Sequence, residues 1–397
     1  MRIIVQKFGG TSVASSEGRE KCRRRVTESI EQGYRPVVVV SAMGRKGQPY
    51  ATDTLIELAG GSVRERELDL VMSCGEVISA VVFCRMLQEE GYPCVALTGG
   101  QAGIITDNSY TNARILKIVP DRLNRELADG KTVVVAGFQG MTSEGEITTL
   151  GRGGSDTTAA ALAAALKAEL AEIYTDVDGV MTADPRVVPE ARVLTRLSYQ
   201  EIMEMAHLGA KVIHPRAVEI AMEGQIPLAV KGLDGQGNGT LIGSHHAVTA
   251  DRVVTGIAHL MGLAQFVLRF NEEDLSLAVF QRLGNAQISI DLIQVNPGLI
   301  AFTVLQSAAE KACNVLGDLP MEVEVRYGFA KVSAVGGGMR GVPGVMARVV
   351  AALNSVGVRI HQTADSHANI SCLVEEKDAE KAVRALHDEF NSGVKMT

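Results

Sequence analysis

The chain has 397 residues, which at about 150 residues per domain predicts two or three domains. With 46% hydrophobic and 21% charged residues, its composition excludes global disorder and fibrous repeats. The formal charge of −7 argues against nucleic acid as a partner, because phosphate backbones select basic surfaces.

The N-terminus and the cysteines indicate the cellular compartment. The first residues, MRIIVQKFGG, contain too short an apolar run for a signal peptide or a membrane span. The six cysteines lie in apolar or helical stretches without CxxC spacing, which favours reduced thiols over disulfides or zinc. We therefore expect a cytoplasmic protein without membrane association, and residue spacing predicts no metal ligands.

Short apolar segments, each bounded by glycine or polar residues, predict six buried β-strands. They lie at residues 3–5, 37–40, 95–97, 133–136, 173–174 and 228–230. Helical patterns lie between them, notably over 65–90 and over the alanine-rich segment 155–166. This alternation predicts an α/β fold with a mostly parallel sheet sandwiched by helices. The glycine-rich segment 232–240 is the strongest break in composition, and we place a domain boundary at residue 244.

The C-terminal third contains an internal repeat. Val279 and Val349 are 70 residues apart, as are Val304 and Val374, and the apolar positions between them recur at the same spacing. Each copy has the order helix, strand, turn, strand. The repeat predicts two small α+β modules that bury their apolar faces against each other.

Two glycine-rich loops lie near predicted strand ends, one directly after the first strand and one before the alanine-rich helix, and the carboxyl edge of a parallel sheet binds ligands. KFGGTS, from Lys7, offers backbone N–H groups and a mobile positive charge to an anion, although a tight turn with a solvated lysine explains it equally well. GRGGSDT is more specific, because its glycines admit a ligand to the backbone and Arg152 offers a planar fork for a carboxylate or phosphate. Asp156 either organises a lysine or magnesium beside a transferring phosphate or only stabilises a helix dipole.

Two further motifs are predicted to lie at the same carboxyl edge of the sheet. YTDVDGVMTADPR, from Tyr174, has acid-rich spacing but lacks the register and the later glutamate of an EF-hand, so a nucleotide-binding turn fits better than calcium. Lys211, in GAKVIHP, either contacts phosphate or adenine or is a solvated helix residue. His214, in the same motif, is expected to be structural.

QKFGGTS, TLGRGGSDTTA, YTDVDGVMTADPR and GAKVIHP, in this order, resemble the aspartokinases of the amino acid kinase family. The C-terminal repeat resembles that family's paired ferredoxin-like ACT regulatory modules. SAMGRKGQPYATD and QTADSH are similar to its diaminopimelate-sensitive members in Bacillus-type bacteria. The resemblance implies a catalytic domain over 1–244 and an interleaved regulatory unit over 245–397. Its first copy would span about 263–328, and its second about 329–397 plus a strand from about 252–262.

The resemblance implies that ATP with Mg²⁺ phosphorylates the side-chain carboxylate of L-aspartate to 4-phospho-L-aspartate. This is the first step towards diaminopimelate, lysine, methionine and threonine. The implied catalytic residues are Lys7, Arg152 and Asp156. The implied ATP contacts are Lys7, Phe8, Gly9, Gly10, Ser41, Thr175, Asp176, Met181, Asp184, Arg186 and Lys211. The implied aspartate contacts are Thr52, Glu76, Arg152, Gly153, Gly154 and Ser155, with Glu76 on the ammonium group and Arg152 on a carboxylate. Met181 departs from the family, in which a tyrosine is common.

Feedback inhibition is also implied, with meso-diaminopimelate as the favoured effector and lysine or threonine as alternatives. The implied effector contacts are Asn271, Asp274, Gln294, Ile360, Asp365, Ser366 and His367. ACT pairing implies a homodimer or higher homo-oligomer. One alternative is a kinase of glutamate or acetylglutamate, against which GRGGSD and the ACT pair argue. A second is a regulatory protein with an inactive kinase domain, which the presence of Lys7, Arg152, Asp156 and Glu76 opposes.

Overall fold

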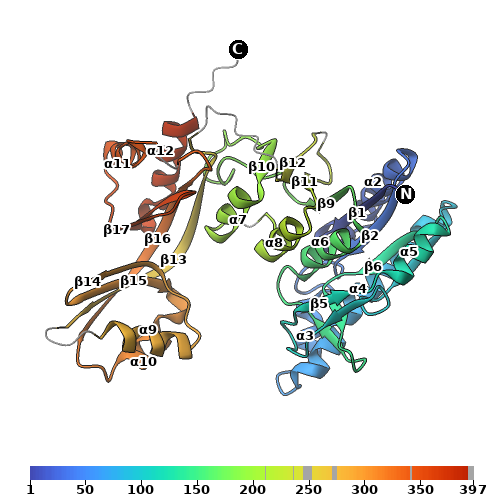
Figure 1. The fold of residues 1–397 in the computed structure, drawn as a ribbon, viewed down its shortest axis with the longest axis horizontal. Coiled ribbons are helices and arrows are strands. Elements are labelled where there is room, and N and C mark those ends of the chain that lie inside the picture. Colours follow the sequence, from blue (N-terminus) through green and yellow to red (C-terminus); the bar gives the residue numbers. More distant parts are fainter. Residues whose placement is uncertain (211, 236, 245–252, 271–274, 340–341, 392–397) are drawn as a thin grey trace, which may run out of the picture. The chain divides into compact units, whose positions relative to one another are not determined.

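The computed structural model describes the chain except for residues 211, 236, 245–252, 271–274, 340–341 and 392–397 (Figure 1). Its internal contacts divide the chain into two compact units. Unit 1 comprises Met1–Val180, Val193–Ala206 and Lys211–Ala247, and unit 2 comprises Met181–Arg192, His207–Ala210 and Val248–Thr397. Two short segments, 181–192 and 207–210, therefore leave the first unit and pack with the second, which the sequence pattern did not indicate.

Unit 1 contains an eight-stranded sheet in the order β10-β12-β11-β9-β1-β2-β6-β3. Its strands are β1 (Ile3–Phe8), β2 (Arg35–Val40), β3 (Cys94–Leu97), β6 (Thr132–Ala136), β9 (Leu170–Thr175), β10 (Arg196–Ser198), β11 (Leu228–Gly232) and β12 (Thr240–Gly243). All neighbours pair in parallel except β11 and β12. The prediction of a mostly parallel sheet is confirmed.

Helices cover both faces of this sheet. The helices between residues 1 and 223 are α1 (Gly10–Ala14), α2 (Ser16–Glu31), α3 (Thr52–Ala59), α4 (Glu65–Glu89), α5 (Asp121–Ala128), α6 (Gly154–Leu166), α7 (Tyr199–His207) and α8 (Pro215–Glu223). Apolar side chains of α2 and α4 pack with Phe8, Val38 and Val134 on one face. The alanine-rich α6 packs on β1 and β9 and against α8. Because its side chains are small, α6 approaches the sheet closely.

A second, four-stranded sheet in the order β5-β4-β7-β8 was not predicted from the sequence. Its strands are β4 (Ile104–Thr106), β5 (Ile115–Ile118), β7 (Gln139–Met141) and β8 (Ile147–Thr149), and β8 packs against α4. Among the described residues, α4 is long and apolar enough to cross a membrane by length and composition alone. Half of that apolar window is buried inside the unit, as expected for the core helix of a globular protein.

Unit 2 is built on a six-stranded antiparallel sheet in the order β14-β15-β13-β16-β18-β17. Its strands are β13 (Gly256–Arg269), β14 (Asp291–Asn296), β15 (Leu299–Leu305), β16 (Glu322–Val335), β17 (Gln362–Asp365) and β18 (Asn369–Glu375). Its helices are α9 (Ser276–Asn285), α10 (Ala309–Leu316), α11 (Val345–Ser355) and α12 (Ala379–Asn391), with 3₁₀ turns η1 (Gln306–Ala308) and η2 (Glu376–Asp378). The long strands β13 and β16 pass through both modules and change register between Leu260 and Gln265.

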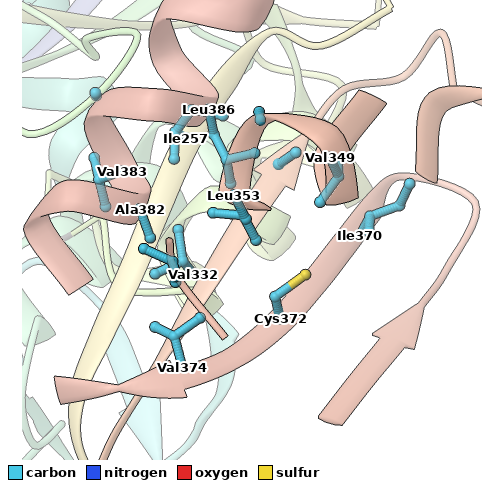
Figure 2. Packing of buried hydrophobic residues seen from close by; sticks show 14 of the residues in the cluster. Ile257, Val332, Val349, Leu353, Ile370, Cys372, Val374, Ala382, Val383 and Leu386 are labelled. Carbon is cyan, nitrogen blue, oxygen red and sulfur yellow. The ribbon is translucent and has the colours of Figure 1, made fainter. Parts of the chain in front are cut away.

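The internal repeat corresponds to two equivalent cores. Val279, Leu283 and Ile300 are buried in the first module, and their counterparts 70 residues later, Val349, Leu353 and Ile370, are buried in the second. Figure 2 shows the second core, with α11 and α12 packed over Val332, Cys372 and Val374. This core also takes in Ala183, Val187 and Val188. The segment 181–192 is therefore anchored in the core of the second module.

Candidate functional site

Lys7 and Asp156 form an ion pair at the carboxyl edge of the parallel sheet. Lys7 lies near the end of β1 and Asp156 in the first turn of α6, and Lys7 Nζ is 2.8 Å from Asp156 Oδ1. Only 12% and 14% of the two side chains are exposed. An ammonium has three donors, so this contact leaves Lys7 able to bind a second anionic group.

The loop after β1 fits closely against the loop after β2. A Cβ on Gly10 would lie 2.5 Å from the carbonyl oxygen of Ala42, so only glycine fits there. The ring of Phe8 is fully buried and stacks on Phe83 and Tyr174. Phe8 can therefore meet a ligand at this edge only through its backbone.

Ser41 and Ser155 bring together a predicted ATP contact and a predicted aspartate contact. Ser41 follows β2, and its hydroxyl donates to the Ser155 hydroxyl at 2.9 Å. A Cβ on Gly137 would lie 2.9 Å from Ser155 Oγ, so the backbone after β6 closes on the same hydroxyl. Three segments from distant parts of the chain thus converge beside the ion pair's helix.

Glu76 is a buried carboxylate, and only one of its two oxygens has a hydrogen-bond partner among the described residues. It lies on α4 with 2% of its surface exposed, and its Oε1 accepts a hydrogen bond from the Ala42 N–H at 3.1 Å. Its Oε2 has no hydrogen-bond partner among the described residues. Burial raises the pKa of Glu76 to about 8. A buried oxygen without a partner is costly, so a cationic ligand would stabilise the ionised form.

Arg152 lies in a tightly constrained stretch of backbone, and its side chain has no partner among the described residues. It lies between Gly151 and Gly153, whose φ angles of +73° and +71° are in the left-handed region that favours glycine. A Cβ on Gly153 would lie 2.3 Å from His214 Cγ. The exposed guanidinium has neither a hydrogen bond nor an ion pair with other described residues, so it is available to an anion.

The remaining contacts predicted in unit 1 lie near strand or helix ends. Thr175 ends β9, and its hydroxyl donates to Asp176 Oδ1 at 3.2 Å. Arg45 Nη2 lies 3.5 Å from Asp176 Oδ2. Thr52 is the first residue of α3 and is half-buried. Lys211 lies outside the described residues.

Three predicted ATP contacts belong to unit 2, so unit 1 alone does not bring them to the Lys7 site. They are Met181, Asp184 and Arg186. Asp184 pairs with Arg186 at 2.7 Å, which holds the pKa of Asp184 below its usual range. The neighbouring Thr182 is buried and hydrogen-bonded to His387 of α12 at 3.0 Å.

The predicted effector contacts that the structure describes lie on or near β14 and β17, the two edge strands of the six-stranded sheet of unit 2. Gln294 is exposed on β14, and Asp365 ends β17. Ser366 and His367 are exposed in the β17–β18 turn, where the Ser366 hydroxyl accepts from the Asn369 N–H at 3.2 Å. Ile360 packs partly against the second core. Asn271 and Asp274 lie outside the described residues.

Two charged residues beside the Arg152 loop were not predicted from the sequence: Asp69, which is buried, and Arg216, which is partly buried. Asp69 of α4 accepts hydrogen bonds from Thr111 and Thr149. Arg216 of α8 donates to the carbonyl groups of Leu150 and Ala113. The only signal for Asp69 was an acidic residue seven positions before Glu76, on the same apolar face of the helix.

Two family models match the chain. Residues 2–232 match the amino acid kinase family, and residues 332–390 match an ACT domain. The chain is 49% identical to Aspartokinase 1 of Bacillus subtilis strain 168 over 400 residues, which covers 98% of this chain and 99% of that protein.

Two solved structures of E. coli aspartokinase III have the same fold. The complex with aspartate and ADP, in the R-state, superimposes with a TM-score of 0.82 at 28% identity, covering 98% of this chain and 100% of that one. The complex with lysine and aspartate, in the T-state, gives a TM-score of 0.78 at 27% identity, covering 98% and 99%. The similarity extends through both units.

Proposed function

This chain belongs to the aspartokinases of the amino acid kinase family and phosphorylates L-aspartate with ATP under ACT-domain regulation, and from this premise we propose which residues perform the transfer. A carboxylate with a reference pKa near 4 is already ionised at pH 7, so the reaction needs no catalytic base. The obstacle is the repulsion between this carboxylate and a triphosphate. The site must supply positive charge and fixed geometry.

Lys7 is proposed to contact the transferring phosphoryl group, with Asp156 holding it in place. Their sheltered 2.8 Å contact supports this assignment, because it fixes the ammonium without using all of its donors. Removing the lysine would leave the developing negative charge uncompensated. Its loss should therefore act on turnover more than on aspartate binding.

Arg152 and Glu76 are proposed to bind the α-carboxylate and the ammonium group of aspartate. The observation that carries this assignment is that, within the part of the chain that the structure describes, the Arg152 guanidinium has no hydrogen bond or ion pair and the buried Glu76 Oε2 has no donor. Aspartate offers one group of each opposite charge. The rest of the proposed pocket consists of Thr52, Gly153, Gly154 and Ser155.

ATP is proposed to lie along the same sheet edge, against Lys7 and the backbone of the following loop. Its other proposed contacts are Phe8, Gly9, Gly10, Ser41, Thr175 and Asp176. Among the described residues no group of three His, Cys, Asp or Glu side chains could hold a metal ion, which fits magnesium bound mainly by the nucleotide's own phosphates. Bound in this way, magnesium would reduce the negative charge that the acceptor meets. For Met181, Asp184, Arg186 and Lys211 the nucleotide role stays a prediction.

The regulatory unit is proposed to bind meso-diaminopimelate, with lysine or threonine as the alternatives. The resemblance of SAMGRKGQPYATD and QTADSH to diaminopimelate-sensitive members supports this choice. The exposed turn at Asp365, Ser366 and His367 offers polar contacts to an amino acid. We further propose a cytoplasmic homodimer or higher homo-oligomer that performs the first step towards diaminopimelate, lysine, methionine and threonine.

Trapping the acyl phosphate with hydroxylamine tests the substrate and the effector together. The full-length enzyme is incubated with ATP, Mg²⁺ and either aspartate, glutamate or acetylglutamate, and the reactions are repeated with each candidate effector. We expect hydroxamate from aspartate alone and inhibition by meso-diaminopimelate. Equal product from glutamate would contradict the proposed pocket, and inhibition by lysine or threonine alone would replace the proposed effector.

A further inference from the structure

Asp69 is a fully buried carboxylate that joins three parts of unit 1. It lies on α4, and both of its oxygens accept from the Thr111 N–H at 3.0 Å. Oδ2 also accepts from the Thr149 N–H at 2.9 Å, and Oδ1 accepts from the Thr149 hydroxyl at 2.6 Å. The helix is thereby tied to the loop before β5 and to the end of β8.

Connecting a helix to a small sheet through a buried carboxylate costs free energy. Among the described residues no lysine, arginine or histidine forms an ion pair with Asp69, so hydrogen bonds alone compensate its burial. An apolar residue of similar volume would avoid burying a charge, but it would leave the Thr111 and Thr149 N–H groups without this acceptor. The carboxylate does what an apolar side chain cannot, because it fixes the direction of two backbone N–H groups.

One of those N–H groups belongs to a strained residue. Thr111 has a φ of +65°, which is a rare conformation for a β-branched residue. Such strain persists only where the surroundings enforce it. A Cβ on Gly151 would lie 3.2 Å from the Thr111 carbonyl oxygen and 2.8 Å from Asn112 Oδ1. Asp69 therefore holds the surface against which Gly151 packs.

The other N–H group belongs to Thr149, which is close to Arg152 in the chain. Thr149 lies three residues before it, and the Thr149 carbonyl accepts from the Ala113 N–H at 2.8 Å. The Leu150 N–H donates to the Phe138 carbonyl at 2.8 Å, and the Gly151 carbonyl accepts from the Gly154 N–H at 3.0 Å. Backbone contacts thus fix the residues on both sides of Arg152, while its guanidinium has no partner among the residues that the structure describes.

Glu76 lies on the same helix as Asp69, seven residues further on, which is about 10 Å along the axis. We propose that Asp69 is a positioning residue that sets the separation between the Arg152 guanidinium and the Glu76 carboxylate. That separation selects the α-carboxylate and ammonium groups of aspartate. The inference rests on the proposed aspartate contacts of Arg152 and Glu76.

Asp69→Asn tests this role. The amide keeps the shape of the carboxylate, but its NH2 group replaces one of the two acceptor oxygens and faces N–H and O–H groups that need an acceptor. We expect the KM for aspartate to rise about ten- to a hundredfold, with the KM for ATP unchanged and kcat within about threefold, since a misplaced guanidinium loses binding that ground state and transition state share. Thr149→Val removes only the 2.6 Å hydroxyl contact and should raise the aspartate KM less. It also keeps the test valid if Asp69→Asn does not fold.

Thr148→Val is the matched control. It breaks the buried 2.6 Å contact between the Thr106 and Thr148 hydroxyls in the same small sheet, one residue from the Asp69 contact. We expect it to lower the thermal midpoint without changing the aspartate KM. Unchanged aspartate KM in both Asp69→Asn and Thr149→Val would overturn the inference, as would equal effects on the KM for aspartate and for ATP.

Arg152→Gln separates this inference from the function on which it rests. If Arg152→Gln leaves the aspartate KM unchanged, the proposed substrate pocket is wrong and the positioning role fails with it. If Arg152→Gln raises that KM while Asp69→Asn does not, only the positioning role is wrong.

Discussion

Aspartate binding should strengthen steeply as the pH rises through 8, because the free enzyme must deprotonate Glu76 before it can hold the substrate's ammonium group. With a pKa of about 8, roughly 3% of the enzyme carries an ionised Glu76 at pH 6.5 and roughly 76% at pH 8.5. Apparent affinity scales with the competent fraction, so the KM for aspartate should fall roughly 25-fold across this range. Initial rates at saturating ATP and several aspartate concentrations measure it.

The control is Glu76→Gln, which keeps the side chain's shape but cannot ionise. Its KM for aspartate should be high at every pH and should not change between pH 6.5 and 8.5. The KM for ATP should be flat in both enzymes over the same range. A flat aspartate profile in the wild-type enzyme, or a sloping one in Glu76→Gln, would refute the assignment of Glu76 to the ammonium group.

Four other outcomes follow from the same geometry. Because the folded-state pKa of Glu76 is raised, the free enzyme should lose on the order of 4 kcal/mol of stability between pH 4.5 and pH 8, and thermal midpoints of wild-type and Glu76→Gln enzymes without aspartate measure the difference. Lys7→Ala should lower turnover by orders of magnitude and leave the aspartate KM mostly intact; unchanged turnover contradicts its role. Gly153→Ala should impair folding or activity, because its Cβ would meet His214 at 2.3 Å in a backbone conformation with a φ of +71°; a fully active, equally stable variant excludes this close packing. Asp365→Ala should relieve inhibition; retained inhibition by every aspartate-pathway amino acid places the effector elsewhere.

Six of the eight strands of the main sheet, all but β10 and β12, and the repeat were predictable because their signals are local. Each predicted strand lies within an observed one, and β1 runs from Ile3 to Phe8 around the predicted segment 3–5. Strands buried on both faces have continuous apolar sequences, so their pattern needs no knowledge of partners. Val279 and Val349 likewise occupy equivalent core positions, because both copies bury the same helix face.

The small sheet was not predictable for the opposite reason. β4, β7 and β8 are three residues long, which is too short for a periodic pattern. β4 pairs with β5 and, through Ile105 and Met141, with β7, so its existence depends on contacts far along the chain. Asp69 was not predicted for the same reason, because its partners Thr111 and Thr149 lie in or next to strands of this small sheet.

The regulatory third shows how a local pattern can be right while its boundaries are not. The strand predicted at about 252–262, assigned to the second copy, and the predicted start of the first copy at 263 fall in one strand, β13, from Gly256 to Arg269. Nothing in the apolar pattern separates one long strand from two short ones. The pairing of its two halves with different parts of β16 decides the matter.

The sequence by itself determined the order of the loops and the residue types that they carry, and the resemblance of these motifs to the aspartokinases implied the chemistry of a carboxylate kinase. Tertiary structure decided which of these residues meet: Lys7 and Asp156, 149 positions apart, form one ion pair, whereas Met181, Asp184 and Arg186 pack with the regulatory unit. It also decided that Glu76 is buried with a raised pKa. Burial and electrostatic interaction depend on distance in space, and distance along the chain does not reveal them.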